Sequence, residues 1–182
     1  MNSTIRTIRN RYSCRNYTGS PVDRDKIEAI AMAAVQSPSA MNMQPWHITV
    51  VQDKAFIDDM DKTTMELLAS QEDKSIYDRI MGRGGKIYYN APCMFVVAKK
   101  AGTDLDSGIV CENIALAAAS LGLGNVICGL ARLSFDSKKG AEYAAKLIPQ
   151  GYEFGIAVLV GYASNPEGVP HEPDTSKITY IG

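Results

Sequence analysis

Arginines are concentrated at the N-terminal end of the chain, where their spacing could bind an anion. The first 22 residues hold four arginines and no acidic residue, although the whole chain has a net charge of only −1. Arg11, Ser13 and Arg15 alternate, and on an extended segment such residues project to one side. Two guanidinium groups flanking a hydroxyl suit a phosphate, because arginine binds its oxygens bidentately and stays charged. The alternative is a solvated basic turn after a short helix.

A second candidate is the connection formed by residues 37–46, which reads SPSAMNMQPW. It is longer than most connections between elements, and long loops in compact domains are often functional. Its small residues permit close approach to a ligand, and the amides of Asn42 and Gln44 can both donate and accept hydrogen bonds. The alternative is a proline-stiffened turn whose amides satisfy each other.

Residues 122–129, GLGNVICG, form a third candidate, because glycines let backbone N–H groups approach a ligand closely. The segment matches neither a P-loop nor the glycine pattern of dinucleotide-binding folds, which needs a preceding strand and a following helix. Cys128 could be a nucleophile, but no histidine is near it in sequence and buried free cysteines are common. A packing role for this thiol is therefore favoured over catalysis.

Other classes of site have little support in the sequence. The four cysteines lie far apart without a C-x-x-C pair, and with only two histidines no metal site is predicted. The nearly neutral charge argues against a nucleic-acid-binding protein. No apolar stretch has the length of a membrane-spanning helix or the form of a signal peptide, so we expect a cytoplasmic protein without membrane contact.

These candidates need a scaffold, and 182 residues with 46% hydrophobic and 21% charged residues fit one globular domain. Strands are predicted over residues 46–52, 93–99, 125–128 and 154–162. Helices are predicted for a short segment ending near Arg9, from an Asp23 cap to residue 35, from an Asp53 cap to about residue 69, from Ser107 to a Gly122 cap, and from Asp136 to residue 147. Residues 70–90 stay unassigned. Interleaved helices and strands predict an α/β or α+β layered sheet.

The last twenty residues, about 163–182, differ from the rest. Pro166, Pro170 and Pro173 lie close together, and the sequence ITYI follows near the end. A proline-rich stretch followed by β-forming residues predicts an extended arm that crosses a surface to pair elsewhere. The organisation expected over residues 1–182 is one domain with a C-terminal arm.

Taken in order, these segments resemble the FMN-dependent nitroreductase family, at the short end of its size range. RYSCR followed by Tyr17 is similar to the family's R-x-S-x-R-x-(F/Y) element, and SPSAMNMQPW is similar to its (A/S)-P-S-x-x-N-x-Q-P-W element. Weaker similarities are Ala91-Pro92 before a strand, GLGNVICGL, and IPQGYEFGIAVLVGY near the end. The resemblance covers most of the chain, and its first two motifs are specific.

The resemblance implies an FMN site at the interface of a homodimer. It places Arg11 and Ser13 on the phosphate side and Arg15 near the pyrimidine edge of the ring, while Cys128 and Gly129 line the ring with a backbone N–H near its reactive nitrogen. The other subunit supplies Pro38, Ser39, Ala40 and Asn42. Further implied FMN contacts are Tyr12, Gln44, Ile127 and Lys177.

The implied fold is α+β, with a central mixed β-sheet flanked by helices, in an intertwined homodimer with a C-terminal arm. The implied activity is that of an FMN-dependent oxidoreductase, which takes hydride from NADH or NADPH and reduces a small acceptor such as a nitroaromatic or quinone in a ping-pong sequence. The flavin carries this chemistry, so no catalytic side chain is required. Alternatives are a metabolite-specific reductase or dehalogenase on the same fold, a non-catalytic flavin-binding or storage protein, and an anion-binding module without flavin.

The sequence departs from the larger family members in two places. Their C-terminal basic pair, which clasps the phosphate, is not evident, and the last twenty residues offer only Lys177, with His171. The middle of the chain aligns poorly, and Arg83 and Lys86 are the candidates for further ring contacts there.

Overall fold

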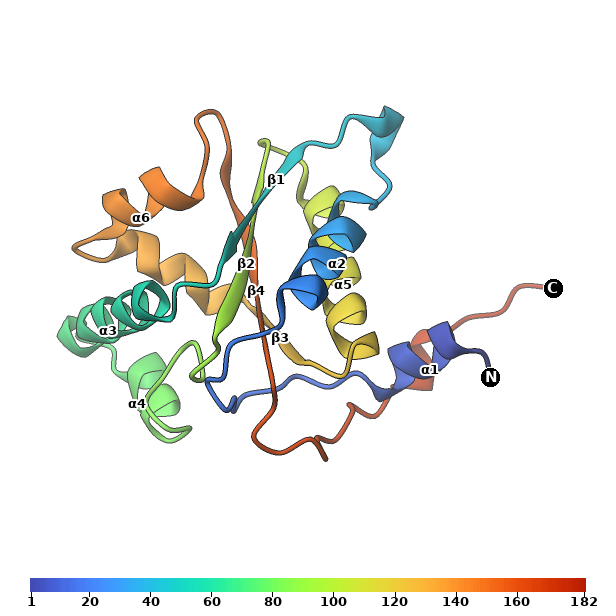
Figure 1. The fold of residues 1–182 in the computed structure, drawn as a ribbon, viewed down its shortest axis with the longest axis horizontal. Coiled ribbons are helices and arrows are strands. Elements are labelled where there is room, and N and C mark those ends of the chain that lie inside the picture. Colours follow the sequence, from blue (N-terminus) through green and yellow to red (C-terminus); the bar gives the residue numbers. More distant parts are fainter.

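A four-stranded sheet lies at the centre of the protein, which we describe in a computed structural model covering residues 1–182 (Figure 1). Its strands are β1 (Trp46–Val51), β2 (Cys93–Lys99), β3 (Gly124–Cys128) and β4 (Glu153–Gly161), and their order is β1-β2-β4-β3. Every pair of neighbouring strands is antiparallel. The expected α+β fold with a central, helix-flanked sheet is confirmed, but the sheet is antiparallel rather than mixed.

The direction of the strands explains why a mixed sheet is wrong. Interleaved helices suggest parallel crossovers, yet a helical connection can also return the chain antiparallel to the strand it left. Here β1 and β2 are joined through α3 (Lys54–Ser70) and α4 (Ser75–Met81), and their register pairs Trp46 with Lys99 and Val51 with Met94. The one parallel pairing is an isolated bridge between Ser13 and Asn125 on β3.

Helices cover both faces of the sheet (Figure 1). One face carries α2 (Arg24–Val35) and α5 (Asp104–Ser120), and the other carries α3, α4, α6 (Gly140–Leu147) and the 3₁₀ segment η2 (Gly129–Asp136). Strand β2 is buried along its whole length. Its side chains alternate between the two cores, with Met94 and Val96 in one and Cys93, Phe95 and Val97 in the other.

Two of the predicted helix boundaries depend on local hydrogen bonds that the structure shows. The Asp53 carboxylate accepts a hydrogen bond from the Phe56 N–H (3.1 Å) and caps α3. Helix α5 ends before Gly122, which has a φ of +75°, and the Leu123 N–H donates to the Ala118 carbonyl at 2.9 Å. A left-handed glycine therefore terminates α5 as predicted.

Other boundaries differ from the prediction. Asp23 occupies the cap position of α2, but its carboxylate accepts from the Tyr162 hydroxyl (2.7 Å) rather than from the helix. Asp136 ends η2 and does not begin a helix, because the chain turns once more before α6 starts at Gly140. A Cβ at Gly140 would overlap the carbonyl of Phe135, so this close turn requires glycine. Helix α5 begins three residues before the predicted Ser107.

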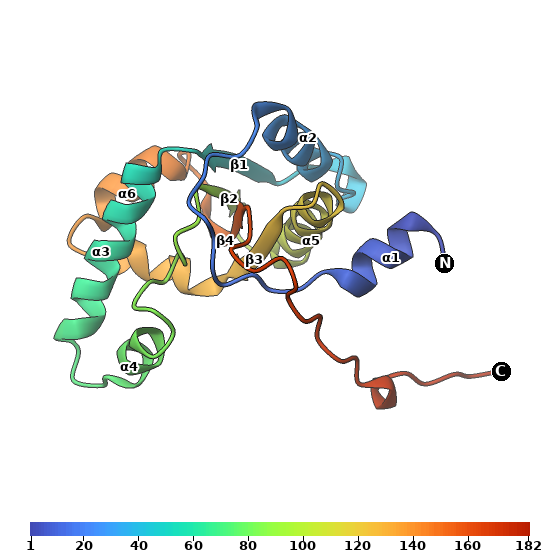
Figure 2. The same cartoon turned by 60° about the horizontal axis from the view of Figure 1, so that its bottom comes forward.

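The two ends of the chain extend away from the sheet on the same side (Figure 2). Helix α1 (Ser3–Asn10) buries none of its residues. After β4, Ala163 forms an isolated bridge with Tyr17, and the rest of the chain contains only the short 3₁₀ turn η3 (Thr175–Lys177). This segment exposes Val169, Ile178, Tyr180 and Ile181. No helix of the structure combines the length and apolar character needed to cross a bilayer.

Candidate functional site

The arginine segment after α1 lies along the outer edge of β3. Ser13 forms the isolated bridge to Asn125, and the Cys14 N–H donates to the Asn125 carbonyl at 2.8 Å. Cys14 points into the core with 3% of its surface exposed, whereas Ser13 and Arg15 on either side of it stay accessible. The segment is therefore extended, as the alternation predicts, and the sheet edge holds it in place.

Arg11 is fixed at the start of this segment by a second contact with the same strand. Its Nη1 donates to Oδ1 of the buried Asn125 at 3.3 Å. Arg15 turns back, and its Nη1 donates to the Ser13 carbonyl at 3.4 Å. Neither guanidinium takes part in an ion pair, so both keep donors for an external anion.

A cleft of about 500 Å³ opens beside Arg11. It is bounded by α1, by the end of α5 and the turn into β3, and by the chain leaving β4. The lining residues are Arg6, Thr7, Asn10, Arg11, Tyr12, Ala119, Ser120, Gly122, Leu123, Gly124, Asn125, Tyr162, Ala163 and Pro166. None of them is acidic, whereas cavities of about 480 and 680 Å³ elsewhere each include three carboxylates. The cleft is thus suited to an anion.

Tyr12 joins the cleft to the C-terminal segment, and Lys177 lies away from the cleft. The Tyr12 hydroxyl donates to the Asn165 carbonyl at 3.2 Å, and a Cβ on Gly168 would overlap the Tyr12 ring. Lys177 is largely exposed in η3, its Nζ lies 3.9 Å from a carboxylate oxygen of Asp174, and it does not line the cleft of its own chain.

The loop between α2 and β1 has an unusual backbone. It contains the 3₁₀ turn η1 (Ala40–Asn42), and Met41, Asn42 and Gln44 have φ values of 49°, 54° and 45°. Three left-handed residues without glycine indicate local strain, which is common at ligand-binding loops. The Gln44 N–H donates to the Ser39 hydroxyl (2.9 Å) and its side-chain amide donates to the Asn42 Oδ1 (3.0 Å), so the amides satisfy each other in part.

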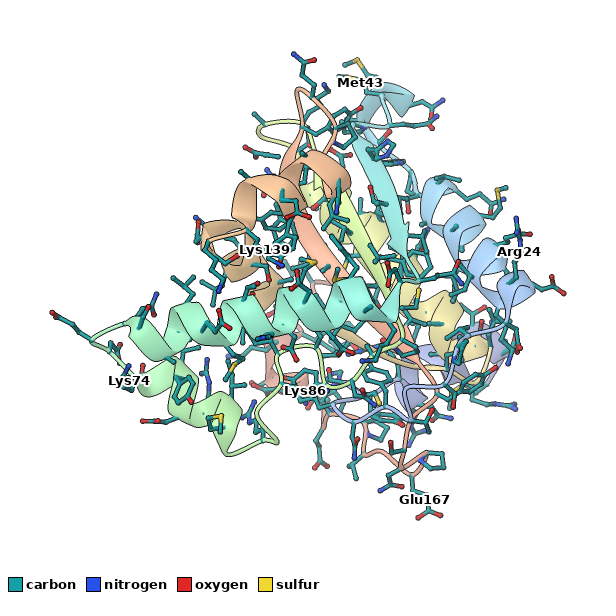
Figure 3. The ribbon with its side chains drawn as sticks, turned by 60° about the vertical axis from the view of Figure 1, so that its left-hand side comes forward. Arg24, Met43, Lys74, Lys86, Lys139 and Glu167 are labelled. Carbon is teal, nitrogen blue, oxygen red and sulfur yellow. The ribbon has the colours of Figure 1, made fainter.

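The loop and the arginine segment lie at opposite ends of α5. The Ala40 N–H donates to the Asp106 carboxylate (3.4 Å) near the start of the helix, while Ala119 near its end lines the cleft. Thirteen residues separate these two contacts, which corresponds to about 20 Å of helix. Figure 3 shows Met43 of the loop and Glu167 of the chain after β4 at opposite ends of the molecule. Within one chain the loop and the cleft therefore do not form a single pocket.

The end of β3 presents an apolar side chain on one side and a buried thiol on the other. Ile127 is 40% exposed, while Cys128 is buried with its sulfur 3.9 Å from the Ile87 carbonyl. Burial raises the pKa of Cys128 to about 11, so the thiol is protonated at neutral pH. Gly129 follows as the first residue of η2. This geometry favours packing for the thiol and leaves the backbone as the group available to a ligand.

A buried carboxylate that we did not predict holds the segment before β2. Asp61 on α3 is 5% exposed and accepts hydrogen bonds from the N–H groups of Ile87 (2.7 Å) and Tyr88 (3.4 Å). Burial raises its pKa, and these two hydrogen bonds oppose the rise. The available signal is that Asp61 lies among Ile57, Met60 and Leu68 on the apolar face of its helix.

The same segment carries the two candidates from the middle of the chain. Lys86 lies beside α3 (Figure 3), with its Nζ 3.8 Å from the Asp58 carboxylate. It lines a cavity of about 480 Å³ between α3 and α4. Arg83 forms no ion pair and does not line that cavity.

Together these observations define an α+β protein with a basic, carboxylate-free cleft at the open edge of an antiparallel sheet. Comparison with known proteins identifies the family of this chain. The sequence model of the Nitroreductase family matches residues 8–149. A relative from Archaeoglobus fulgidus, provisionally named an NADH dehydrogenase/NAD(P)H nitroreductase, is 31% identical over 138 residues, which cover 71% of this chain and 69% of the relative. The chain belongs to the Nitroreductase family, as its motifs predict.

Solved structures agree with this assignment. A nitroreductase with bound FMN from Desulfitobacterium hafniense superimposes with a TM-score of 0.95 at 43% identity, covering the whole of both chains. A nitroreductase with bound FMN from Bacteroides fragilis, 24% identical, superimposes with a TM-score of 0.87, again over the whole of both chains, and supports the fold.

Proposed function

We propose that this protein is an FMN-dependent oxidoreductase that takes hydride from NADH or NADPH and reduces a small acceptor such as a nitroaromatic or a quinone. Membership of the Nitroreductase family and the 43% identity to an FMN-bound nitroreductase confirm the expected enzyme class and cofactor. The observation in this chain that carries the proposal is the carboxylate-free cleft beside Arg11, which sits on the sheet edge at Asn125.

Arg11 in the cleft, and Ser13 and the end of β3 outside it, fit the chemistry of a flavin mononucleotide. Arg11 offers charge-assisted donors to the phosphate, and the accessible hydroxyl of Ser13 lies two residues further along the same segment. From there β3 leads away from Arg11 to the exposed Ile127 and the backbone of Cys128 and Gly129, over about 13 Å from residue 125 to residue 129. When bound, FMN supplies the acceptance and donation of hydride. The chain binds the phosphate, orients the ring and keeps the Cys128 thiol protonated and out of the reaction.

The site is completed, in this proposal, by the loop of a second copy of the chain. Pro38, Ser39, Ala40, Asn42 and Gln44 lie on the loop that is about 20 Å of helix away from the cleft of their own chain. In this proposal they contact the flavin held at Arg11 of the partner, not a flavin in the cleft of their own chain. A homodimer brings the loop of one chain to the cleft of the other.

The C-terminal segment has the properties of an arm that docks on the partner. Residues 164–182 form no strand of their own, and Ile178, Tyr180 and Ile181 are exposed. Docking of this segment would cover those side chains and bring Lys177 to the partner's surface. We place the protein in the cytoplasm, where reduced nicotinamide dinucleotides are available.

Optical spectroscopy on the purified protein tests the proposal. We expect a flavin absorption band that NADH or NADPH bleaches much faster than it bleaches free FMN. Bleaching at the rate of free FMN would instead identify a flavin-binding or storage protein, and a colourless protein that takes up no FMN would contradict the flavin site itself.

Steady-state kinetics test the order of the two half-reactions. If the donor leaves before the acceptor enters the same space above the ring, double-reciprocal plots at several acceptor concentrations are parallel. Intersecting lines would show that donor and acceptor bind together. A panel of nitroaromatics, quinones, halogenated compounds and enones distinguishes broad reduction from a single preferred metabolite.

A further inference from the structure

The four residues 87–90, which lead into β2, contact both elements that the proposed function places at the flavin ring. At the end of β3, the Cys128 thiol donates to the Ile87 carbonyl at 3.9 Å. Just beyond the arginine segment, the Tyr17 N–H donates to the Tyr89 carbonyl at 3.2 Å. One short segment therefore connects the backbone at the end of β3 with the chain that carries the arginines.

The second half of this segment has an unusual backbone. Tyr89 and Asn90 have φ values of 51° and 65°, a left-handed conformation that is uncommon for residues other than glycine and needs contacts to hold it. The Asn90 side chain donates to the Tyr17 carbonyl at 3.2 Å, so both residues hold Tyr17. Arg15 lies two residues before Tyr17, and its place beside β3 therefore depends on where residues 87–90 lie.

Asp61 on α3 fixes the first half of the segment. Its carboxylate accepts hydrogen bonds from the N–H groups of Ile87 (2.7 Å) and Tyr88 (3.4 Å). All three residues are buried, so water does not compete for these hydrogen bonds. Asp61 thus holds the peptide units on either side of the Ile87 α-carbon, and the Ile87 carbonyl among them receives the Cys128 thiol.

A chain of buried hydroxyl groups ties the same segment to η2. The Tyr88 hydroxyl is hydrogen-bonded to Ser134 Oγ at 2.5 Å, and Ser134 Oγ is hydrogen-bonded to Thr64 Oγ1 at 2.6 Å. Thr64 donates its single hydroxyl proton to the Met60 carbonyl (2.6 Å). Ser134 therefore donates to Thr64, and Tyr88 donates to Ser134. Because Ser134 belongs to η2, Tyr88 restrains the turn that begins at Gly129.

We propose that Asp61 and Tyr88 are positioning residues for the reaction: through residues 87–90 and η2 they set how the arginine segment lies relative to the backbone at Gly129. The proposal rests on the proposed function, which places the flavin ring between these two elements. Both side chains are buried and act through the backbone that they hold. A shift of about 1 Å at the reacting centre can slow a reaction about a hundredfold, whereas affinity for the phosphate depends on Arg11.

Tyr88→Phe tests the proposal, because it removes one hydroxyl and keeps the buried ring. We expect NADH or NADPH to bleach the bound FMN about tenfold more slowly, while the dissociation constant for FMN changes less than about twofold. Tyr143→Phe is the matched control. The Tyr143 hydroxyl is hydrogen-bonded to Thr63 and Asp59 on α3, but not to η2 or residues 87–90, so this variant should keep the wild-type rate of bleaching.

Two further measurements distinguish positioning from a general loss of stability. In the flavin-free protein, the amides of residues 127–133 should exchange hydrogen faster in Tyr88→Phe than in the wild type, and at the wild-type rate in Tyr143→Phe. If Tyr88 acts through Ser134, then Ser134→Ala slows bleaching to the same extent, and the double variant is no slower than either single variant.

The conservative variant of Asp61 completes the test. Asp61→Asn keeps an acceptor for the Ile87 N–H and should retain most of the bleaching rate that Asp61→Ala loses. The proposal is overturned if Tyr88→Phe and Tyr143→Phe bleach at the same rate, or if the effects of Tyr88→Phe and Ser134→Ala are additive. Either result in a wild type that binds and reduces FMN would leave the proposed function standing, and a wild type that binds no FMN would contradict both.

Discussion

Arg11 connects the fold of this protein to its proposed chemistry. Its guanidinium donates to the buried Asn125 amide of β3 and lines the cleft at the same time. A side chain held in this way loses little further conformational freedom when an anion binds, so more of the interaction free energy appears as affinity. The neutral Asn125 orients the guanidinium without neutralising it, which a carboxylate in the same place would do.

Removing this guanidinium should release most of the FMN. For Arg11→Ala we expect the dissociation constant for FMN to rise ten- to a hundredfold, because a charge-assisted hydrogen bond to a phosphate contributes about 1.5–3 kcal/mol. Arg9→Ala removes the same charge from a position outside the cleft and should have little effect. Flavin-to-protein ratios and fluorescence titration measure both variants. An unchanged constant for Arg11→Ala would exclude Arg11 from the site.

Asp61 gives the protein a pH dependence that is unusual for a carboxylate. Burial raises the pKa of Asp61, so the folded protein binds this proton more tightly than the unfolded chain, whose aspartates have a pKa of about 3.9. The contribution of Asp61 to stability is therefore complete below the unfolded pKa and declines as the pH rises through the folded pKa. Asp61→Asn keeps an acceptor oxygen for the Ile87 N–H and has no proton to lose.

Urea unfolding of the wild type and Asp61→Asn between pH 3.5 and pH 7 measures this effect. We expect the variant to gain stability relative to the wild type as the pH rises. Asp61→Ala should lose about 1–3 kcal/mol, because the N–H groups of Ile87 and Tyr88 are left without their acceptor. A difference between wild type and Asp61→Asn that does not change with pH would show that the carboxyl titrates normally.

At the scale of elements, α5 determines the distance between the two parts of the proposed site, the loop and the cleft. Its first turns contact the loop through Asp106, and its last turn forms one wall of the cleft. The length of the helix thus fixes the separation of the two candidate elements. Its end is set by Gly122, which has a φ of +75° and open space around it.

Two glycines of this region should respond to alanine in opposite directions. Gly122→Ala places a Cβ on a left-handed residue without a steric neighbour, so it should cost about 1–2 kcal/mol of stability through backbone strain alone. Gly108→Ala lies inside α5 with equally open surroundings, and there alanine should stabilise by about 0.5–1 kcal/mol. Thermal unfolding of both variants measures the contrast. Destabilisation by Gly108→Ala would mean that the partner chain packs against this face of α5, which also carries the exposed Leu105.

The elements that sequence predicts well are those specified by local chemistry. Asp53 caps a helix through its own backbone neighbours, Gly122 ends one through its φ, and the run 93–99 is apolar enough to specify a buried strand. Strand direction depends instead on how a whole connection packs, and the turn before Gly140 depends on contact with Phe135. Helix α4 and the hydrogen bonds of Asp61 also depend on segments distant in sequence, so local patterns do not predict them.

The candidate site likewise combines features that the sequence predicts with features that it does not. Its residue types and spacing are readable from the motifs, and the extended alternation around Ser13 follows from them. The sequence does not predict that the cleft lacks carboxylates, because the residues that line the cleft come from α1, α5 and the chain after β4. The separation of loop and cleft likewise requires knowing that α5 lies between them.

At the scale of the whole molecule, the single chain leaves apolar side chains uncovered at the loop end of α5 and along the C-terminal segment. Met41 and Leu105 at the loop end of α5 are 88% and 80% exposed, and Ile178 and Tyr180 of the C-terminal segment are 56% and 89% exposed. Exposed apolar groups that are gathered on a surface mark regions where proteins associate. A homodimer would cover them and would join the loop of one chain to the cleft of the other.

A mixed dimer of one Arg11→Ala chain and one Asn42→Ala chain tests this arrangement directly. If each flavin is bound by the cleft of one chain and the loop of the other, one site carries both substitutions and the other carries neither. The native site should then retain about half of the wild-type activity and one tightly bound FMN per dimer. If both residues served the flavin of their own chain, each site would carry one substitution and neither would recover.

The experiment needs both single variants to be strongly impaired as homodimers, which is measured first. Co-expression of differently tagged chains and two-step affinity purification then isolates the mixed dimer. Arg9→Ala paired with Asn42→Ala is the matched control: in either arrangement one site of that dimer lacks Asn42→Ala and stays active. Activity of the Arg11→Ala/Asn42→Ala dimer no higher than the mean of its two parent homodimers would mean that the two residues do not act on one flavin from different chains. The roughly 20 Å of α5 between loop and cleft would then have to be bridged by some other contact within the chain.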